Sequence, residues 1–189
     1  MKKTNKILLV VGTRPNFIKM QSLIKLFFES KFHSVLVHAG QHYDYEMSKV
    51  FFKDLKIPEP NYFLKPNLKN HITQVSSMME EFDKVVTKTQ PDLIMVPGDV
   101  NSSLACALVA GIKNIPLAHI ESGLRSFDLK MPEEKNRIII DKLSQFLFVT
   151  EKSGLDNLLA EGHNNKHIQF VGNTMMDSLV MLLPKIKEN

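Results

Sequence analysis

The sequence predicts an α/β domain built on a doubly wound, mostly parallel sheet. Short apolar runs of strand length alternate along the chain with longer stretches whose apolar residues recur at helical spacing. Several such runs joined by helices favour a parallel sheet that is covered on both faces. At 189 residues, 43% of them hydrophobic, the chain is long enough to bury one sizeable core. We therefore expect one domain throughout.

Six apolar runs are the candidate strands. They comprise residues 7–11, 34–39, 93–96, 117–120, 146–149 and 168–171. The stretch "KIPEPNYFLKPNLKN", residues 56–70, is a long interruption rich in proline and asparagine. We expect it to be a connection that carries at most one short strand.

Helical spacing marks the segments between these strands. Residues 16–30 place one apolar set on a single helix face: Phe17, Met20, Leu23, Ile24 and Phe27. Residues 71–88 repeat the pattern with Ile72, Val75, Met79, Phe82 and Val86. Further helices are expected to start near Asn101 or Ser102, at Pro132 and at Ser153, and a last one to run from about Met175 to Lys187.

Composition argues against several classes of function. The formal charge is +4, but the lysines are scattered through helical stretches, which indicates a solvated surface rather than a nucleic-acid-binding stripe. The apolar runs are far shorter than the ~20 residues needed to cross a bilayer, so no membrane partner is expected. The single cysteine, Cys106, lies among small apolar residues, which fits a reducing, cytoplasmic setting. His38 and His42 are separated by a strand end and a loop, an arrangement that does not favour a shared metal.

Parallel sheets of this kind bind ligands beyond the carboxyl ends of their strands. In the first such loop, "GTRPNFIK", Gly12 lets the backbone approach a ligand closely and Pro15 suits a first helical position. A helix start offers N–H groups to an anion, and Arg14 and Lys19 add two positive charges. These features suit a phosphate or diphosphate, but they equally fit an ordinary strand-to-helix turn with two surface cations. The loop is neither a Walker sequence nor the GxGxxG fingerprint.

Acidic residues follow two later strands. Asp99 comes directly after a buried-looking strand in "VPGDVNSS", where Asp99, Asn101 or Ser102 could equally cap the next helix. Glu121, delivered together with His119 by the next strand, is a carboxylate at a partly desolvated strand end. Such a carboxylate suits acid–base work.

A further acidic position lies at the start of the helix at Pro132, where Glu133 and Glu134 are adjacent. Compensation of the helix dipole accounts for one of the two. Carboxylates that face a cationic anion site indicate acid–base chemistry on a phosphorylated or nucleotide-activated substrate. The composition of the loops leaves the identity of that substrate open.

Six segments of the chain resemble one enzyme family. "GTRPNFIKM", "AGQHYD", "PGDVNSSLA", "HIESGLRS", "MPEEKNR" and "VGNTMMDSL" occur in the order and approximate spacing of the non-hydrolysing UDP-N-acetylglucosamine 2-epimerases. The resemblance runs from Lys6 to about Leu179. It implies an isomerase that interconverts UDP-N-acetylglucosamine (UDP-GlcNAc) and UDP-N-acetylmannosamine (UDP-ManNAc), by anti elimination of UDP to 2-acetamidoglucal and syn re-addition. It implies no nicotinamide, metal or other cofactor, and family members commonly feed cell-surface polysaccharides.

The resemblance also implies roles for individual residues. Arg14 and Lys19 correspond to positions that face UDP, with Gly12 and His42 on the same substrate-binding side. Three acidic residues match the family's catalytic positions: Asp99, Glu121 and Glu133. Arg137 matches a position on the substrate-binding side and is expected to orient these carboxylates.

The family is built from two Rossmann-like domains in a GT-B arrangement, and this chain resembles only the first. We expect residues 1–175 to form the Rossmann-like N-terminal domain and residues 176–189 a helix leading towards an absent second domain. In the family that second domain carries a catalytic histidine and most uridine contacts. The chain would then be an epimerase half, active weakly or not at all alone, that pairs as a homodimer or with a second domain. The alternatives are a non-catalytic sugar-nucleotide-binding or partner-binding domain, and the N-terminal domain of a GT-B glycosyltransferase.

Overall fold

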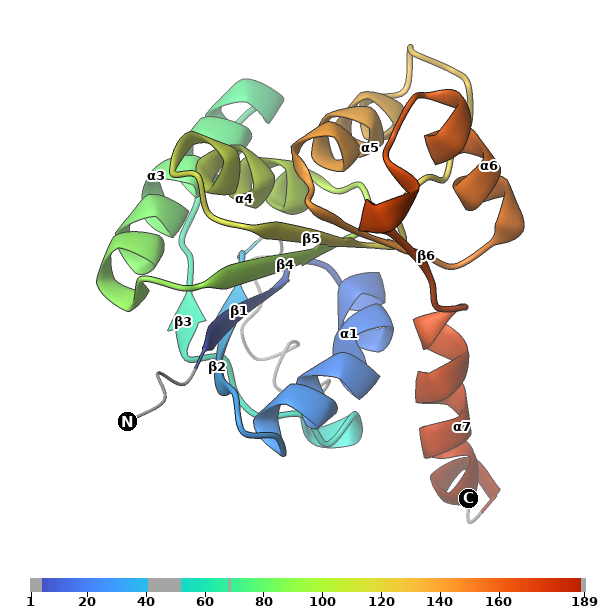
Figure 1. Cartoon of the computed structure of the whole chain (residues 1–189). Coiled ribbons are helices and arrows are strands. Elements are labelled where there is room, and N and C mark those ends of the chain that lie inside the picture. Colours follow the sequence, from blue (N-terminus) through green and yellow to red (C-terminus); the bar gives the residue numbers. More distant parts are fainter. Residues whose placement is uncertain (1–4, 41–51, 68, 188–189) are drawn as a thin grey trace.

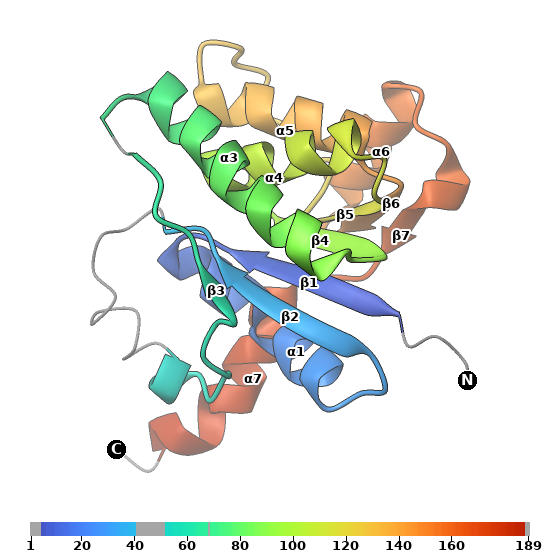
Figure 2. The ribbon, with the colours of Figure 1, turned by 90° about the vertical axis from the view of Figure 1, so that its left-hand side faces the viewer.

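Seven parallel strands form one sheet with helices on both faces (Figures 1 and 2). The computed structural model describes residues 5–40, 52–67 and 69–187. From one edge to the other the strand order is β3-β2-β1-β4-β5-β6-β7, and every neighbouring pair is parallel. The predicted doubly wound, mostly parallel α/β sheet is therefore confirmed.

The strands agree with the predicted runs to within one residue at each end. They are β1 (Lys6–Val11), β2 (His33–His38), β3 (Tyr62–Phe63), β4 (Leu93–Pro97), β5 (Leu117–Ile120), β6 (Phe146–Val149) and β7 (Ile168–Phe170). The two-residue strand β3 is the one short strand expected within residues 56–70.

The helices divide between the two faces of the sheet. On one face lie α1 (Arg14–Phe28) and α7 (Thr174–Lys187), and on the other α3 (His71–Thr89), α4 (Asn101–Ile112) and α5 (Pro132–Leu143) (Figure 1). Near the β7 edge, α6 (Lys152–Ala160) packs on β6 and β7, and a short 3₁₀ helix, η1 (Asn165–His167), leads into β7.

Strand β1 shows why helices must cover both faces of the sheet. Its residues alternate between two buried clusters: Leu9 packs with Phe17 of α1, and Leu8 packs with Phe82 of α3 and Cys106 of α4. Successive side chains of a strand point to opposite faces, so a strand that is apolar at every position must be buried on both.

The apolar face predicted for α3 is partly wrong. Phe82 and Val86 are buried as expected, but Ile72 in the first turn is 83% exposed. The buried residues of α3 begin only at Met78. The helix therefore contacts the core through its second half, and the periodic apolar residue in its first turn has no core to meet.

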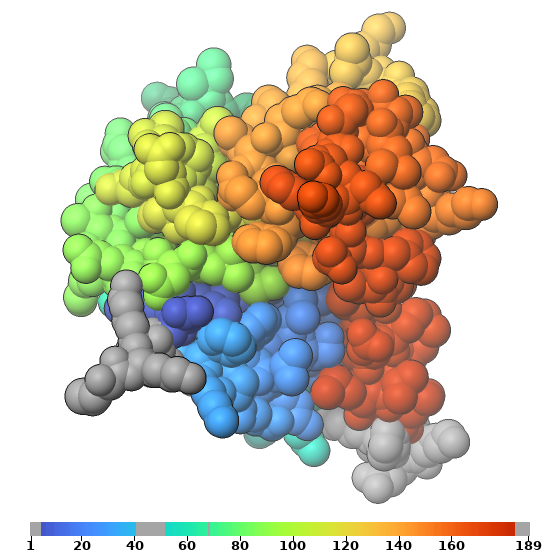
Figure 3. Space-filling view, in the orientation of Figure 1, coloured from blue at the N-terminus to red at the C-terminus, as the bar shows by residue number. Residues whose placement is uncertain are grey.

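Helix α7 packs along α1, as the red and blue segments of Figure 3 show. Ser178 Oγ donates a hydrogen bond to the Ile18 carbonyl at 2.6 Å, and Leu182 packs against the core cluster on the α1 face. The helix begins at Thr174, next to the expected domain boundary at 175, which stays a prediction. Within the described residues, no helix is both long and apolar enough to span a membrane.

The strand order fixes where a ligand site is expected. Strand β1 has β2 on one side and β4 on the other, so the chain reverses its direction of travel across the sheet between β1 and β4. In open parallel sheets the crevice at this switch point, beyond the carboxyl ends of the strands, is the usual ligand site. The loops that start at Gly12 and Gly98 border it.

Candidate active site

The turn between β1 and α1 is held by an asparagine. The side chain of Asn16, which is 2% exposed, accepts hydrogen bonds from the N–H groups of Gly12 (3.2 Å) and Thr13 (3.0 Å). These two N–H groups, just before the first residue of the helix, are thus satisfied within the turn. A Cβ atom on Gly12 would lie 2.2 Å from Ser102 Oγ, so close packing against α4 requires glycine here. Arg14, the first residue of α1, is exposed.

Lys19 and Glu121 meet beyond the strand ends. Lys19 Nζ contacts Glu121 Oε2, and the two side chains are 16% and 15% exposed. A Cβ atom on Gly98 would lie 3.3 Å from Lys19 Nζ and 3.4 Å from Glu121 Oε2. The first half of α1 and the loops after β4 and β5 therefore converge on one spot beyond the strand ends, as the sequence predicted.

Glu121 occupies a backbone conformation that is rare for its residue type. Its φ angle is 70°, in the left-handed region, which costs a residue with a Cβ atom about 1–2 kcal/mol. The N–H groups of Glu121 and Ser122 both donate to the Phe148 carbonyl, at 3.0 and 3.1 Å. The end of β6 thus helps to hold the turn that presents the carboxylate.

Asp99 is an ion-pair partner and not a helix cap. Its Oδ2 lies 2.5 Å from Arg137 Nη2, and the N-cap of α4 is Val100, with no side-chain hydrogen bond. Asn136 Nδ2 donates to the Asp99 carbonyl at 2.8 Å. Burial alone would lower the pKa of Arg137, but Glu134 and Asp99 outweigh it and raise the pKa. Arg137 therefore stays a cation that orients Asp99.

The two adjacent glutamates of α5 have different surroundings. Glu134 is 1% exposed and accepts hydrogen bonds from the N–H groups of Ser126 and Phe127, both at 2.9 Å, and from Arg137 at 2.8 Å. Burial alone would raise the pKa of Glu134, but these hydrogen bonds lower it below its usual value. Glu133 is exposed at the helix start. Glu134 thus secures the preceding loop, and Glu133 is the one open to a ligand.

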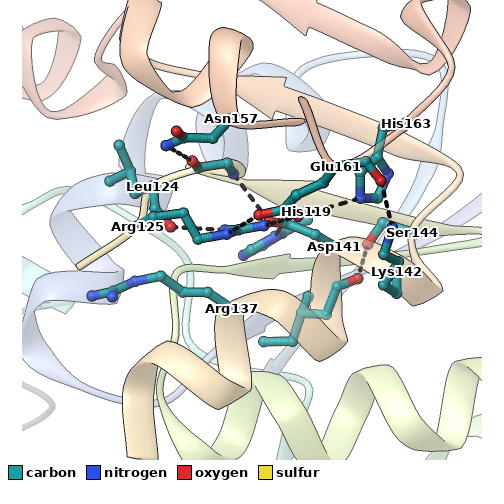
Figure 4. Close-up of polar contacts among 12 residues, drawn as sticks. His119, Leu124, Arg125, Arg137, Asp141, Lys142, Ser144, Asn157, Glu161 and His163 are labelled. Carbon is teal, nitrogen blue, oxygen red and sulfur yellow. Dashed lines mark hydrogen bonds and ion pairs between the residues drawn. The ribbon is translucent and has the colours of Figure 1, made fainter. Parts of the chain in front are cut away.

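A buried polar network that we did not predict lies behind the site (Figure 4). Asp141 accepts from His119 Nδ1 (2.6 Å), from the Gly123 N–H (3.2 Å) and from Arg125 (2.8 Å), and Arg125 also pairs with Glu161 at 2.7 Å. His119 and Asp141 are both fully buried. A carboxylate directly after the apolar run of residues 138–140 is a sequence signal that could have indicated a buried role.

The profile of a family described as UDP-N-acetylglucosamine 2-epimerase matches residues 25–189. This chain belongs to the UDP-N-acetylglucosamine 2-epimerase family.

Individual members of the 2-epimerase family are similar over nearly the whole chain. A UDP-N-acetylglucosamine 2-epimerase of Methanococcus maripaludis is 42% identical over 184 residues, which are 97% of this chain and 50% of that protein. A UDP-2,3-diacetamido-2,3-dideoxy-D-glucuronate 2-epimerase of Pseudomonas aeruginosa is 43% identical over 176 residues, 92% of this chain and 50% of that protein. The crystal structure of the Methanocaldococcus jannaschii UDP-GlcNAc 2-epimerase in complex with UDP-GlcNAc and UDP has a TM-score of 0.93 and 40% identity, and the match covers 97% of this chain and 51% of that one.

The chain spans about half the length of the curated 2-epimerases it matches. Family membership agrees with the resemblance found in the sequence. It argues against the alternative that the chain is the N-terminal domain of a GT-B glycosyltransferase. Of the residues expected in a 2-epimerase site, the structure brings together Lys19, Glu121 and the loop that carries Asp99. His42 lies outside the described residues. His38 accepts from the Gly40 N–H at 2.9 Å and stacks on Phe63, and among the described residues no cluster of three or more His, Cys, Asp or Glu could hold a metal.

Proposed function

We propose that this chain is the N-terminal half of a UDP-N-acetylglucosamine 2-epimerase and carries its catalytic carboxylates. The observation that carries the proposal is the Lys19–Glu121 pair at the switch point of the sheet, beside the loop of Gly98 and Asp99. Cation and carboxylate stand together where a parallel sheet binds its ligand.

The reaction needs both kinds of charge. Abstracting the proton from sugar C2 is difficult unless the C1–O bond breaks with it, so the proton passes to a carboxylate while the electron pair of that bond leaves with UDP. Asp99, Glu121 and Glu133 supply carboxylates for the proton and for the cationic character at C1. Lys19 and Arg14 balance the charge that builds up on the departing diphosphate. Re-addition of UDP at C1, with return of a proton to the opposite face of C2, then gives UDP-ManNAc.

Lys19 has a second task in this proposal. In the structure its ammonium group is paired with Glu121. A bound diphosphate competes with that carboxylate for the same cation, because both are anions within its reach. Substrate binding thus draws Lys19 away and leaves Glu121 ready to accept a proton only when a substrate is present.

The proposed sugar specificity rests on the similarity of this chain to named relatives. The M. maripaludis relative and the P. aeruginosa relative, whose names give different sugars, are 42% and 43% identical to this chain. We propose UDP-GlcNAc, because the family profile and the M. jannaschii structure both carry that name. We also propose a cytoplasmic reaction that supplies cell-surface polysaccharides, as the family resemblance implies.

The test is a ¹H NMR assay of UDP-GlcNAc with the 189-residue chain, alone and mixed with the separately expressed second half of the M. maripaludis relative. We expect UDP-ManNAc to form on mixing, with little or none from the chain alone. A parallel sample with UDP-2,3-diacetamido-2,3-dideoxy-D-glucuronate tests the sugar. If the halves associate and neither sugar reacts, the non-catalytic sugar-nucleotide-binding domain becomes the better account.

A further inference from the structure

A pair of fully buried residues connects the backbones of the two loops that carry the candidate carboxylates. We propose that His119 and Asp141 form a positioning pair, which fixes the Gly98 carbonyl before Asp99 and the Gly123 N–H after Glu121. This inference rests on the proposed function, because it assigns these two residues a task in the same site.

The first arm of the pair reaches the β4 loop. His119 Nε2 lies 2.8 Å from the Gly98 carbonyl oxygen, which belongs to the peptide bond that leads into Asp99. The Gly98 N–H in turn donates to the Ile120 carbonyl at 2.9 Å. The imidazole and the backbone together tie the end of β4 to the end of β5. The orientation of the peptide group that leads into Asp99 is therefore fixed.

The second arm reaches the turn after β5. Asp141 Oδ2 accepts the Gly123 N–H at 3.2 Å, and the Gly123 carbonyl accepts from Asn157 Nδ2 at 2.9 Å. Gly123 has a φ of 80°, and a Cβ atom there would lie 2.3 Å from the Gly154 carbonyl oxygen. The two peptide groups that flank the Cα atom of Gly123 are thus both held by side chains. These hydrogen bonds offset the strain of the left-handed Glu121.

The pair positions the site and does not touch the substrate. His119 and Asp141 are 0% exposed, and the Arg125 side chain that closes the network is 2% exposed. Figure 4 draws Arg137 apart from this network, and Arg137 pairs instead with Asp99 at 2.5 Å. Burial raises the pKa of Asp141, but His119 and Arg125 outweigh it, so the pKa lies below its usual value. An ionised Asp141 and the Gly98 carbonyl are both acceptors, so each ring nitrogen of His119 faces an acceptor.

The variants are chosen to separate positioning from stability. Asp141→Asn keeps the shape of the side chain and removes an acceptor. His119→Phe removes both hydrogen-bonding ring nitrogens of the imidazole. His119→Gln restores a donor that can reach the Gly98 carbonyl. Ile140→Val is the matched control, since Ile140 is also 0% exposed on α5 and lies outside the network.

Two readouts are compared in the 189-residue chain. The first is the crystal structure of each variant, which gives the φ of Glu121, the Lys19–Glu121 contact and the Gly98 peptide plane. The second is turnover of UDP-GlcNAc with the second half of the M. maripaludis relative, resolved into kcat and KM. Thermal unfolding is recorded for every variant.

We expect Asp141→Asn and His119→Phe to release Glu121 from the left-handed region or to turn the Gly98 peptide. We expect kcat to fall about 100-fold with KM changed less than about threefold, because a displacement of about 1 Å has an effect of that size. His119→Gln recovers about tenfold of that loss. Ile140→Val lowers the unfolding temperature but leaves kcat and the Glu121 conformation unchanged.

The proposal is overturned if the variants fold and both Asp99 and Glu121 keep their places, or if Ile140→Val lowers kcat as much as Asp141→Asn does. If Asp141→Asn does not fold, the comparison of His119→Phe with His119→Gln decides in the same way. If the wild-type halves associate but are inactive together, the proposed function fails, and the crystal structures still decide whether the pair positions the two loops.

Discussion

At the scale of single residues, Lys19 and Glu121 define the site. They lie 102 positions apart in the sequence, and their ion pair forms because β1, β4 and β5 are neighbours in the sheet. Both side chains are largely shielded, so neither charge is well solvated without the other. A buried charge that loses its partner keeps its desolvation cost. The pair is therefore sensitive to any change in either residue.

We predict that Lys19→Met weakens UDP binding by about tenfold or more, because a diphosphate loses a charged hydrogen-bond donor worth more than ~1.4 kcal/mol. The measurement is an NMR titration of the chain with UDP. Lys25→Met is the control, since Lys25 is exposed on the same helix. Equal affinities for wild type and Lys19→Met would mean that Lys19 serves only to hold Glu121.

The adjacent glutamates of α5 offer a matched pair. We predict that Glu134→Gln lowers the free energy of unfolding by about 1–3 kcal/mol, because an amide cannot accept from two N–H groups and Arg137 as a carboxylate does. Glu133→Gln changes it by less than ~0.5 kcal/mol, as expected for an exposed residue. Urea unfolding measures both. For turnover we predict the opposite order: Glu133→Gln lowers turnover more than Glu134→Gln does. Glu133→Gln is then only weakly active although it is fully folded. A fully active Glu133→Gln would remove Glu133 from the catalytic set.

Glu134 also predicts a pH dependence of stability. Its pKa in the folded protein lies below the ordinary value of 4.5. A lowered folded pKa means that the contribution is complete above the unfolded value and is lost as the pH falls through the folded one. The difference in unfolding free energy between wild type and Glu134→Gln should therefore be constant near neutral pH and shrink at acid pH. A difference that stays unchanged to about pH 3 would contradict the assignment.

At the scale of elements, the apolar pattern is enough to predict six of the seven strands and most helix faces. It works for α1, where Phe17, Met20 and Ile24 are buried as expected, because that helix lies along the sheet for its whole length. It fails for Ile72, because periodicity does not say where the core ends. A helix can be predicted from its own sequence, whereas how much of the helix contacts the core depends on the assembled sheet.

The candidate site was predictable in part for the same reason. Ligands bind beyond the carboxyl ends of parallel strands, and Lys19, Asp99 and Glu121 all follow strands in the sequence. This rule therefore places them at the same end of the sheet. Without the family resemblance, Glu133 and Glu134 could not be separated, since adjacent helical residues point about 100° apart and only the loop before α5 decides which one is buried. The role of Asp141 depends on α5 packing beside β5, which no local pattern contains.

The turn between β1 and α1 gives a prediction at this scale. Gly12→Ala should lower the free energy of unfolding by about 1–3 kcal/mol, because the added Cβ atom would meet Ser102 Oγ at 2.2 Å and overpack the contact with α4. Thermal unfolding measures the loss. Adding Ser102→Ala should recover part of it, since the nearest atom is then gone. A double variant no more stable than Gly12→Ala would point to another cause.

At the scale of the whole molecule, the chain presents surface that suits a further partner. Helix α7 carries several exposed apolar residues: Met176, Leu179, Val180, Met181 and Leu183. A cavity of about 390 Å³ between α1, α7 and the sheet is lined by Leu26, Phe148 and their neighbours. Exposed apolar patches of this kind mark interaction sites. Its relatives are about twice as long, so association with a second domain or a second copy is consistent with this surface.

The most direct measurement of the central claim is proton exchange at C2 of UDP-GlcNAc in D₂O. The chain is mixed with the second half of the M. maripaludis relative, and deuterium at C2 is followed by ¹H NMR for wild type and Glu121→Gln. Our account predicts exchange at C2 for the wild type and at least ~100-fold slower exchange for Glu121→Gln, as for loss of a catalytic acid–base group. Halves that associate and bind UDP but never exchange the C2 proton would contradict a catalytic role for this site.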